Sequence, residues 1–415
     1  MRYDLAIIGA GWAGFNAAKK AQVAGLKVAL IEKDLIGGTC LNRGCIPTKV
    51  LLQSAKVCNL SKKAKNFGIT ISEAKVNFLE IQARKDKIIS QLRQGMEFLL
   101  KGVDVIQAEA KIVGEHTLET GGKIIEAEHI LIASGSKPIE LTGFKFDGKK
   151  ILTSDDILNL KEIPKSLLII GGGVIGCEFA TLFSSLGSEV TIAEKLPQLL
   201  PSEEPEVAKK LELALKKKGI KVNTNIDAAS INVDNYSCIL VCVGRRPEEK
   251  ISVDDFLRTA TPSIYAAGDC IGKLMLAHYA AYQGEMVIEN ILHPNSAKKY
   301  SSANVPSCIF TDPEVASVGL KESEAKNNGF DIKINKFDFL ASGMARILDE
   351  TEGFIKIITD KRTDKILGAS IIGPRATELI GIFTLALSSE LTAAQIKNTI
   401  FAHPTLSETI HDALK

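Results

Sequence analysis

The sequence lacks an excess of charge of either sign, which argues against a large nucleic-acid surface. Its 415 residues include 51 basic and 49 acidic side chains, giving a formal net charge of +2. Basic residues form short clusters beside acidic segments, and we interpret the cluster at residues 216–221 as a solvated helix end. The composition therefore predicts no nucleic-acid partner.

The sequence also lacks a long hydrophobic run free of charge and of clustered glycine. The apolar N-terminus contains Asp4 and three glycines within residues 9–14, where a signal peptide would have an uninterrupted apolar helix. The apolar stretch 167–187 reaches transmembrane length, but it contains Glu178 and a glycine cluster near its middle. We therefore expect a cytoplasmic protein without a membrane partner.

Eight cysteines in a chain without an export signal do not predict a structural disulfide framework. Cys40 and Cys45 lie five residues apart in GGTCLNRGCIPTK (37–49), and no second pair of Cys or His at suitable spacing accompanies them. No metal site is expected, whereas a structural disulfide and a redox pair both remain open. The other cysteines are expected to be small core residues: Cys58, Cys177, Cys238, Cys242, Cys270 and Cys308.

One structural plan occurs twice in the chain. Residues 3–33 and 165–195 each run from an apolar strand through G-x-G-x-x-G to a helix, a second strand and a glutamate. The first glycine and the glutamate are 23 residues apart in both copies. Such a unit places a pyrophosphate at the helix N-terminus and a ribose near the acid. The two copies therefore predict two dinucleotide sites.

The remaining patterns predict further domains. Residues 76–101 have helical periodicity, and residues 129–138 are typical of a strand followed by a Gly/Ser turn. From about residue 300, alternating strands and a helix near 376–390 predict an α+β domain. A chain of this length exceeds one ordinary core. Because no low-complexity linker separates the parts, we expect two or three domains packed together.

Four ordered segments carry a resemblance to a known family: GGTCLNRGCIPTK, GGGVIGCEFA, TPSIYAAGDC and AHPTLSE. With them the whole chain resembles the flavoprotein (pyridine nucleotide) disulfide oxidoreductases, and within that family it is most similar to the dihydrolipoamide dehydrogenases. The resemblance implies an α/β fold with two Rossmann-like domains and a C-terminal α+β dimerisation domain. The expected limits are residues 1–148 and 258–299 for a discontinuous FAD-binding domain, 149–257 for a shortened NAD-binding domain, and 300–415 for the dimerisation domain.

The resemblance implies FAD and NAD as cofactors and a redox disulfide between Cys40 and Cys45. Cys40 would be the outer thiol that exchanges with substrate, and Cys45 the inner one, whose thiolate forms a charge-transfer complex with the flavin. On an ideal helix, residues five apart point about 140° away from each other. The pair therefore needs a broken helix start, which Gly44 and Pro47 are suited to supply. A helix N-terminus at Cys45 would favour its thiolate.

The resemblance also implies a proton acceptor from the C-terminal segment. His403 would act as the base in the partner's site of a homodimer, with Glu408 orienting its imidazole. Lys49 and Glu178 would form an ion pair beside the flavin. One departure is Phe401, which occupies a position where lipoamide dehydrogenases commonly carry another histidine. This departure bears on the substrate more than on the mechanism.

The family's cofactor contacts fall on residues of both glycine motifs and on several turns. The implied FAD contacts are Gly9, Gly11, Gly14, Glu32, Lys49, Ala110, Ser134, Gly135, Ser136, Asp269, Met275, Leu276, Ala277 and His278. The implied NAD contacts are Gly171, Gly173, Val174, Ile175, Gly176, Glu194 and Gly244. Glu194 favours NAD over NADP, because its carboxylate would repel a 2′-phosphate ~4 Å away by roughly 4 kcal/mol at an effective dielectric of about 20.

The activity implied is oxidation of protein-bound dihydrolipoamide to lipoamide with NAD+, with a lipoyl-bearing protein of a 2-oxo acid dehydrogenase or glycine cleavage system as partner. One alternative is an NADH-dependent reductase of another small disulfide. A second is a non-turnover flavoprotein subunit with an impaired NAD domain. This second alternative arises because the chain is shorter than typical members of the family it resembles, once after residues 219–225 and again after GRRP (244–247).

Overall fold

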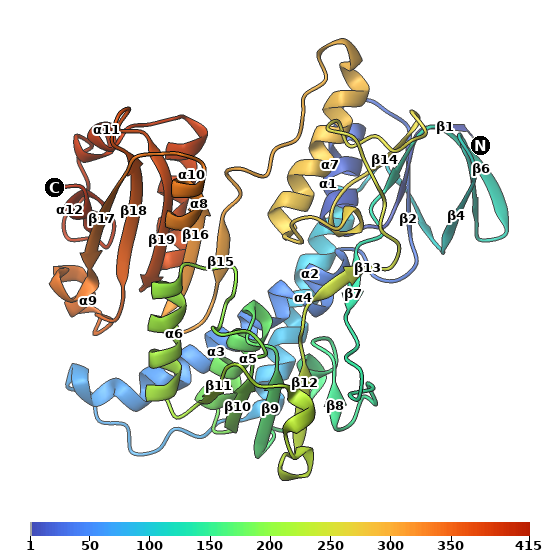
Figure 1. The fold of residues 1–415 in the computed structure, drawn as a ribbon. Coiled ribbons are helices and arrows are strands. Elements are labelled where there is room, and N and C mark those ends of the chain that lie inside the picture. The colour runs from blue at the N-terminus through green and yellow to red at the C-terminus, as the bar shows by residue number, and fades with distance from the viewer. Residues whose placement is uncertain (1) are drawn as a thin grey trace.

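The computed structural model describes residues 2–415 and is built around three β-sheets (Figure 1). Residue 1, the first residue of the predicted FAD-binding domain, lies outside the described part. Two sheets are largely or wholly parallel, and the C-terminal one is antiparallel. The predicted fold class, α/β with two Rossmann-like units and a C-terminal α+β unit, is confirmed.

The first sheet has the strand order β3-β2-β1-β6-β5-β4, and β14 pairs with β6. Its central strand β1 lies parallel to both β2 and β6. All five residues of β2 are buried, because a parallel sheet is covered on both faces. The strands are β1 (Arg2–Ile8), β2 (Val28–Glu32), β3 (Asp104–Gln107), β4 (Ala110–Gly114), β5 (Thr117–Thr120), β6 (Lys123–Ile132) and β14 (Ile264–Ala266).

Helices α1 (Trp12–Val23) and α7 (Ala277–Leu292) pack closely together beside this sheet (Figure 1). A Cβ atom at Gly284 of α7 would lie 2.2 Å from the carbonyl oxygen of Ala13, so only glycine permits this approach. Two segments far apart in the sequence thus frame the first glycine turn.

The second sheet is parallel, with the order β11-β10-β9-β12-β8. One of its faces contacts a cluster that contains Phe144 and Ala228, with Ile231 and Tyr236 packed against it. The short connection after β11 therefore still covers that face, although the sequence is abbreviated there. The strands are β8 (Ile151–Leu152), β9 (Ser166–Ile170), β10 (Glu189–Ala193), β11 (Lys221–Asn223) and β12 (Cys238–Val241).

The third sheet is antiparallel, with the order β15-β16-β19-β18-β17. Helix α10, the helix expected near 376–390, packs on β16 and β19. The strands are β15 (Ser307–Ile309), β16 (Glu314–Gly319), β17 (Ile332–Asp338), β18 (Phe354–Asp360) and β19 (Ile366–Gly373). The remaining helices are α2 (Gly38–Arg43), α3 (Cys45–Lys63), α4 (Phe78–Leu99), α5 (Val174–Ser185), α6 (Pro205–Lys217), α8 (Glu322–Asn327), α9 (Gly343–Ile347), α10 (Ala376–Ser388), α11 (Ala393–Lys397) and α12 (Glu408–Ala413).

The three sheets fall within the three predicted domain ranges, and the exact domain limits stay a prediction. A two-stranded ribbon of β7 (Ser136–Pro138) and β13 (Arg245–Pro247) joins the first two units. The basic cluster at 216–221 is not wholly solvated, which corrects the sequence interpretation. The Lys218 side chain forms an ion pair with the carboxylate of Asp312 in the third unit, and its Nζ also donates a hydrogen bond to the backbone carbonyl oxygen of Asp312.

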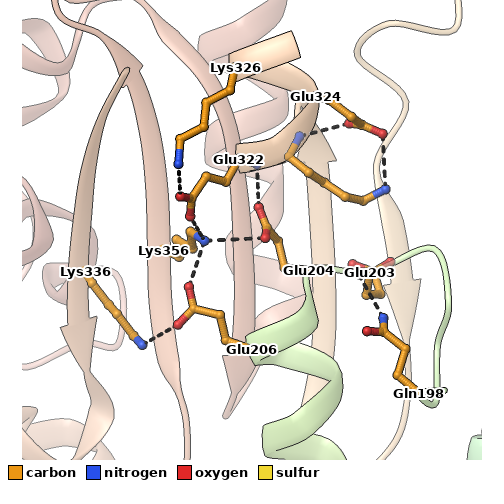
Figure 2. Close-up of polar contacts among 10 residues, drawn as sticks. Gln198, Glu203, Glu204, Glu206, Glu322, Glu324, Lys326, Lys336 and Lys356 are labelled. Atoms are coloured by element: carbon orange, nitrogen blue, oxygen red, sulfur yellow. Dashed lines mark hydrogen bonds and ion pairs between the residues drawn. The ribbon is translucent and has the colours of Figure 1, made fainter. Parts of the chain in front are cut away.

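A buried lysine also attaches the second unit to the third (Figure 2). The side chain of Lys356 on β18 is 1% exposed, and its Nζ lies 2.7 Å from Glu206 Oε1 and 2.8 Å from Glu322 Oε2. Glu204 Oε2 is 3.4 Å away, and Glu204 Oε1 accepts the backbone N–H of Glu322 at 2.6 Å. Glu204 and Glu206 also lie at the N-terminus of α6, where negative charge is stabilised. Nearby, Lys336 pairs with Glu206 at 2.8 Å.

Replacing Lys356 should weaken this attachment far more than replacing Lys336. In Lys356→Met the buried carboxylate of Glu204 loses its cation, and breaking a buried pair costs about 3–5 kcal/mol. Lys336→Met breaks an exposed pair worth about 1 kcal/mol or less. Urea unfolding followed by circular dichroism would compare the two variants. Equal shifts of the first unfolding transition would contradict the importance of the buried lysine.

Candidate active site

The two glycine turns have the same internal geometry. Gly9 has φ +101°, and a Cβ there would lie 2.4 Å from the carbonyl oxygen of Ala133. A Cβ at Gly14 would lie 1.9 Å from the carbonyl oxygen of Gly9. In the second copy, Gly171 has φ +113° and Gly176 would bring a Cβ to 2.0 Å from the Gly171 oxygen. Packing alone thus requires glycine at the first and third positions of each turn.

The second glycine of each motif, Gly11 or Gly173, is not required by protein packing. A Cβ at Gly11 or Gly173 would meet no described atom within 4 Å. Their φ angles, −68° and −75°, are open to any residue. Glycine there therefore leaves room for a ligand rather than for the protein, which fits the approach of a pyrophosphate. Neither α1 nor α5 has a side-chain N-cap, so their first N–H groups are available to an anion.

The acid that ends each copy has a role that sequence reasoning missed. Glu32 Oε2 accepts the N–H of Ala10 at 2.7 Å, and its Oε1 accepts the N–H of Asp34 at 2.8 Å. Glu194 accepts the N–H groups of Gly172 at 2.5 Å and Leu196 at 2.7 Å in the same way. Each acid therefore holds its glycine turn in shape. A carboxylate has about four acceptor positions, so capacity remains for ribose hydroxyls.

The other predicted FAD contacts lie around the end of the first sheet. The Ser136 hydroxyl donates to Asp269 Oδ2 at 2.6 Å, so the Ser134–Ser136 turn and Asp269 are brought together. Arg245, which sequence reasoning missed, donates to the Ser136 hydroxyl at 3.0 Å and to its carbonyl oxygen at 2.7 Å. Of the other implied FAD contacts, Ala110 begins β4, Met275 and Leu276 precede α7, and Ala277 and His278 begin α7. Of the implied NAD contacts, Val174 and Ile175 begin α5, and Gly244 precedes β13.

The cysteine pair lies at a break between two helices, as expected. Helix α2, which contains Cys40, ends at Arg43, and α3 begins at Cys45. Gly44 makes the break, and a Cβ there would lie 3.0 Å from the carbonyl oxygen of Thr39 and 3.3 Å from the Cys40 Cα. Both cysteines are free thiols in this structure, and the Cys40 S–H donates to the Cys45 sulfur.

The two thiols have opposite acidities. The pKa of Cys45 is lowered to about 7, mainly by the hydrogen bond from Cys40 and also by the positive charge of Lys49, against the effects of burial and of Glu178. The pKa of Cys40 is raised above its usual range by that same hydrogen bond and by burial. The hydrogen bond and the charge of Lys49 therefore favour the thiolate on Cys45 and the protonated thiol on Cys40.

Lys49, one helical turn after Cys45, forms the predicted ion pair with Glu178 of α5. Its Nζ lies 2.9 and 2.8 Å from the two carboxylate oxygens. Glu178 is almost fully buried and also accepts the backbone N–H of Phe310 at 3.0 Å. The Lys49 Nζ lies 4.7 Å from the centroid of the Phe310 ring, a cation–π contact. Phe310 is another residue that sequence reasoning missed, because nothing local marks it.

His403 and Glu408 form the expected pair in the C-terminal unit. His403 Nδ1 lies 2.8 Å from Glu408 Oε1, while Glu408 Oε2 accepts the N–H of Thr405 at 2.8 Å. The N–H of Thr405 and then the His403 ring lower the pKa of Glu408, so it stays ionised. The His403 side chain is 81% exposed. Figure 1 shows α12, which carries Glu408, far from α2 and the start of α3 in the same chain.

Among residues 2–415, no group of three or more His, Cys, Asp or Glu side chains is arranged to hold a metal ion. In the same range, no helix has the length and apolar character needed to cross a membrane.

Known protein families match nearly the whole chain. Residues 3–284 match the family model of the pyridine nucleotide-disulphide oxidoreductases, and residues 305–414 match the dimerisation domain of the same family. The chain belongs to this family. Its cofactors are accordingly FAD and NAD, and the dimerisation domain supports a homodimer.

Relatives extend the likeness over the full length. A dihydrolipoyl dehydrogenase of Bacillus subtilis is 41% identical, covering 99% of this chain and 97% of the relative. A dihydrolipoyl dehydrogenase from Chlamydia muridarum is 40% identical, covering 98% of this chain and 95% of the relative. Among solved structures, LpdA from Mycobacterium tuberculosis has a TM-score of 0.91 at 27% identity, covering 100% of this chain and 99% of that one. The HOCl-induced flavoprotein disulfide reductase RclA from Escherichia coli has a TM-score of 0.88 at 28% identity, with the same coverage.

The acidity of Cys45 gives a testable pH dependence. In the reduced protein, alkylation of Cys45 by iodoacetamide should rise through about pH 7, since its pKa is lowered to about 7 and only the thiolate reacts. In Cys40→Ala the midpoint should move upward, because the main cause of the lowering is lost. Peptide mass spectrometry would follow both. Cys308, whose pKa burial raises to about 11, serves as the unreactive internal control, and an unchanged midpoint in the variant would contradict the assignment.

Proposed function

We propose that this protein is a dihydrolipoyl dehydrogenase-type enzyme that oxidises protein-bound dihydrolipoamide with NAD+. The thiol pair at the start of α3, with a thiolate at Cys45 beside the Lys49–Glu178 ion pair, is the observation that carries the proposal. The full-length relatives named dihydrolipoyl dehydrogenase support it. The first glycine turn and Glu32 would hold FAD, which would supply the route for an electron pair from the reduced thiol pair to NAD+.

The exchange steps follow from the acidities of the two thiols. A thiolate of the substrate attacks the Cys40 sulfur of the disulfide, and the Cys40–Cys45 bond breaks with its electron pair going to Cys45. Cys45 suits this departure because a thiol of low pKa is the better leaving group. The second substrate sulfur then attacks the sulfur bonded to Cys40, which closes the lipoamide ring and releases Cys40.

The substrate dithiol must lose its protons during these steps. His403 of the partner subunit would accept them one at a time, because its Nδ1 is bound to Glu408 and its Nε2 remains available. The first proton would pass to solvent, and the second would be returned to the Cys40 thiolate, which ends as the protonated thiol. The wide separation of α12 from α2 and the start of α3 in the same chain supports a contribution across the dimer (Figure 1). The lipoyl-bearing partner, from a 2-oxo acid dehydrogenase or glycine cleavage system, and a cytoplasmic location are part of this proposal.

The principal competing function is reduction of another small disulfide by NADH. The flavoprotein disulfide reductase named among the similar structures and the phenylalanine at position 401 favour it. A non-turnover subunit is less well supported, because the second glycine turn, Glu194 and a covered five-stranded sheet are all present in the NAD unit.

Anaerobic addition of NADH tests turnover at the NAD site. The visible spectrum of the oxidised flavin should be lost while a long-wavelength band grows, because the Cys45 thiolate would form the charge-transfer complex with the flavin that the family resemblance implies. A protein that remains yellow and spectrally unchanged would overturn the dehydrogenase proposal.

The role of His403 is tested separately. His403→Gln should lower lipoamide turnover by ~10² to 10⁴, while NADH should still reduce the flavin at the normal rate. His411→Gln is the matched control, since His411 lies on α12 and contacts only Asp412 in the described ion pairs. A similar loss in both variants would show that the effect is structural rather than catalytic.

A further inference from the structure

The chain has one tryptophan, Trp12, at the first position of α1. This position adjoins the thiol pair, because the starts of α1 and α2 touch. The N–H of Gly37 donates to the carbonyl oxygen of Ala10 at 2.9 Å. A Cβ at Gly38 would lie 2.8 Å from the Gly11 Cα, so the two backbones are in close contact. Two residues further along α2 is Cys40.

The indole N–H of Trp12 is buried and has no hydrogen-bond partner of ordinary geometry among the described residues. Buried donors are normally paired, so an unpaired one calls for an explanation. The indole N–H faces Cys40 and acts to lower its pKa, against the hydrogen bond to Cys45 and the burial that together raise it. The other charged or titratable groups that face the Cys40 thiol are Cys45 and Lys49, both on α3, and Glu178 on α5 faces Cys45.

We propose that Trp12 is the hydrogen-bond donor that stabilises the thiolate of Cys40 during thiol–disulfide exchange. While Cys40 is a protonated thiol, its S–H donates a hydrogen bond to Cys45, and its own sulfur is only a weak hydrogen-bond acceptor. When Cys40 becomes a thiolate, the same sulfur is a strong acceptor and the indole N–H is already in place. A donor fixed where charge develops needs no reorganisation at the moment of reaction.

The indole N–H of Trp12 matters at one step of the proposed reaction. This inference rests on the proposed function. In the second exchange the new sulfur–sulfur bond of lipoamide forms, and the bond from the substrate to Cys40 breaks with its electron pair going to Cys40. Cys45 already carries a negative charge beside it, and that charge opposes a second thiolate. The indole is neutral, so it stabilises the leaving thiolate without cancelling the negative charge of Cys45.

The test measures the acidity of Cys40 without substrate or NADH. In the flavin-loaded Cys45→Ser protein, Cys40 is the only thiol of the pair, and its alkylation by iodoacetamide is followed against pH. Adding Trp12→Phe keeps an aromatic ring but removes the N–H. Loss of one hydrogen bond to a charged sulfur should raise the apparent pKa by about one unit and slow alkylation about tenfold below that pKa. Identical pH profiles with and without the indole N–H would overturn the proposal.

A second measurement needs no change at position 12. Because Trp12 is the only tryptophan, the ¹⁵N-labelled protein gives a single indole N–H signal. In Cys45→Ser this signal should shift with pH along the same curve as Cys40 alkylation. It should stay fixed when Cys40 is also replaced, in Cys40→Ser/Cys45→Ser. A signal that never follows the titration of Cys40 would reject the contact, even if Trp12→Phe fails to fold.

These results separate the inference from the proposed function. Both measurements report on Trp12 and Cys40 whatever the substrate is, whereas lipoamide turnover tests the function. An unaltered Cys40 acidity in an enzyme that oxidises dihydrolipoamide would leave the function standing and reject the role of Trp12. If Trp12→Phe shifts the pKa of Cys40 but the protein has no lipoamide activity, the role of Trp12 would stand and the proposed function would be rejected.

Discussion

The ion pair between Lys49 and Glu178 is the interaction on which the site depends. It joins α3, which begins with Cys45, to α5, which begins at the second glycine turn, and Phe310 adds a backbone N–H from the C-terminal unit. A buried carboxylate without its cation is strongly unfavourable. The ion pair therefore links the redox helix to the NAD unit, and the Phe310 N–H links that pair to the C-terminal unit.

Much of this site could be predicted from the sequence, because its elements are encoded locally. The glycine turns, the break at Gly44 and the pairing of His403 with Glu408 each depend on residues a few positions apart, so their spacing is visible in the chain. The helix at 376–390 and the twofold strand–turn–helix plan were visible for the same reason. Two dinucleotide-binding units followed from those patterns, whereas the family, FAD and NAD followed from the resemblance of four segments to a known family.

The contacts that sequence reasoning missed join distant segments. Lys356 is the clearest case, since its carboxylate partners Glu204, Glu206 and Glu322 lie 34 to 152 positions away. Its neighbours along β18, Ile355 and Ile357, are apolar and give no local sign of an ion pair. Arg245 is similar, because its partner Ser136 lies on another strand. The basic cluster at 216–221 was misread for this reason, since Asp312 is almost a hundred residues further on.

The double use of Glu194 limits how cofactor preference could change. The same carboxylate that would repel a 2′-phosphate also accepts the N–H groups of Gly172 and Leu196, so it forms part of the turn. Replacing it by a basic residue would remove two acceptors from the loop in the act of changing its charge. A lineage moving toward NADP would have to supply a new acceptor and a new phosphate ligand together. The preference for NAD is thus protected against single substitutions by the way the turn is built.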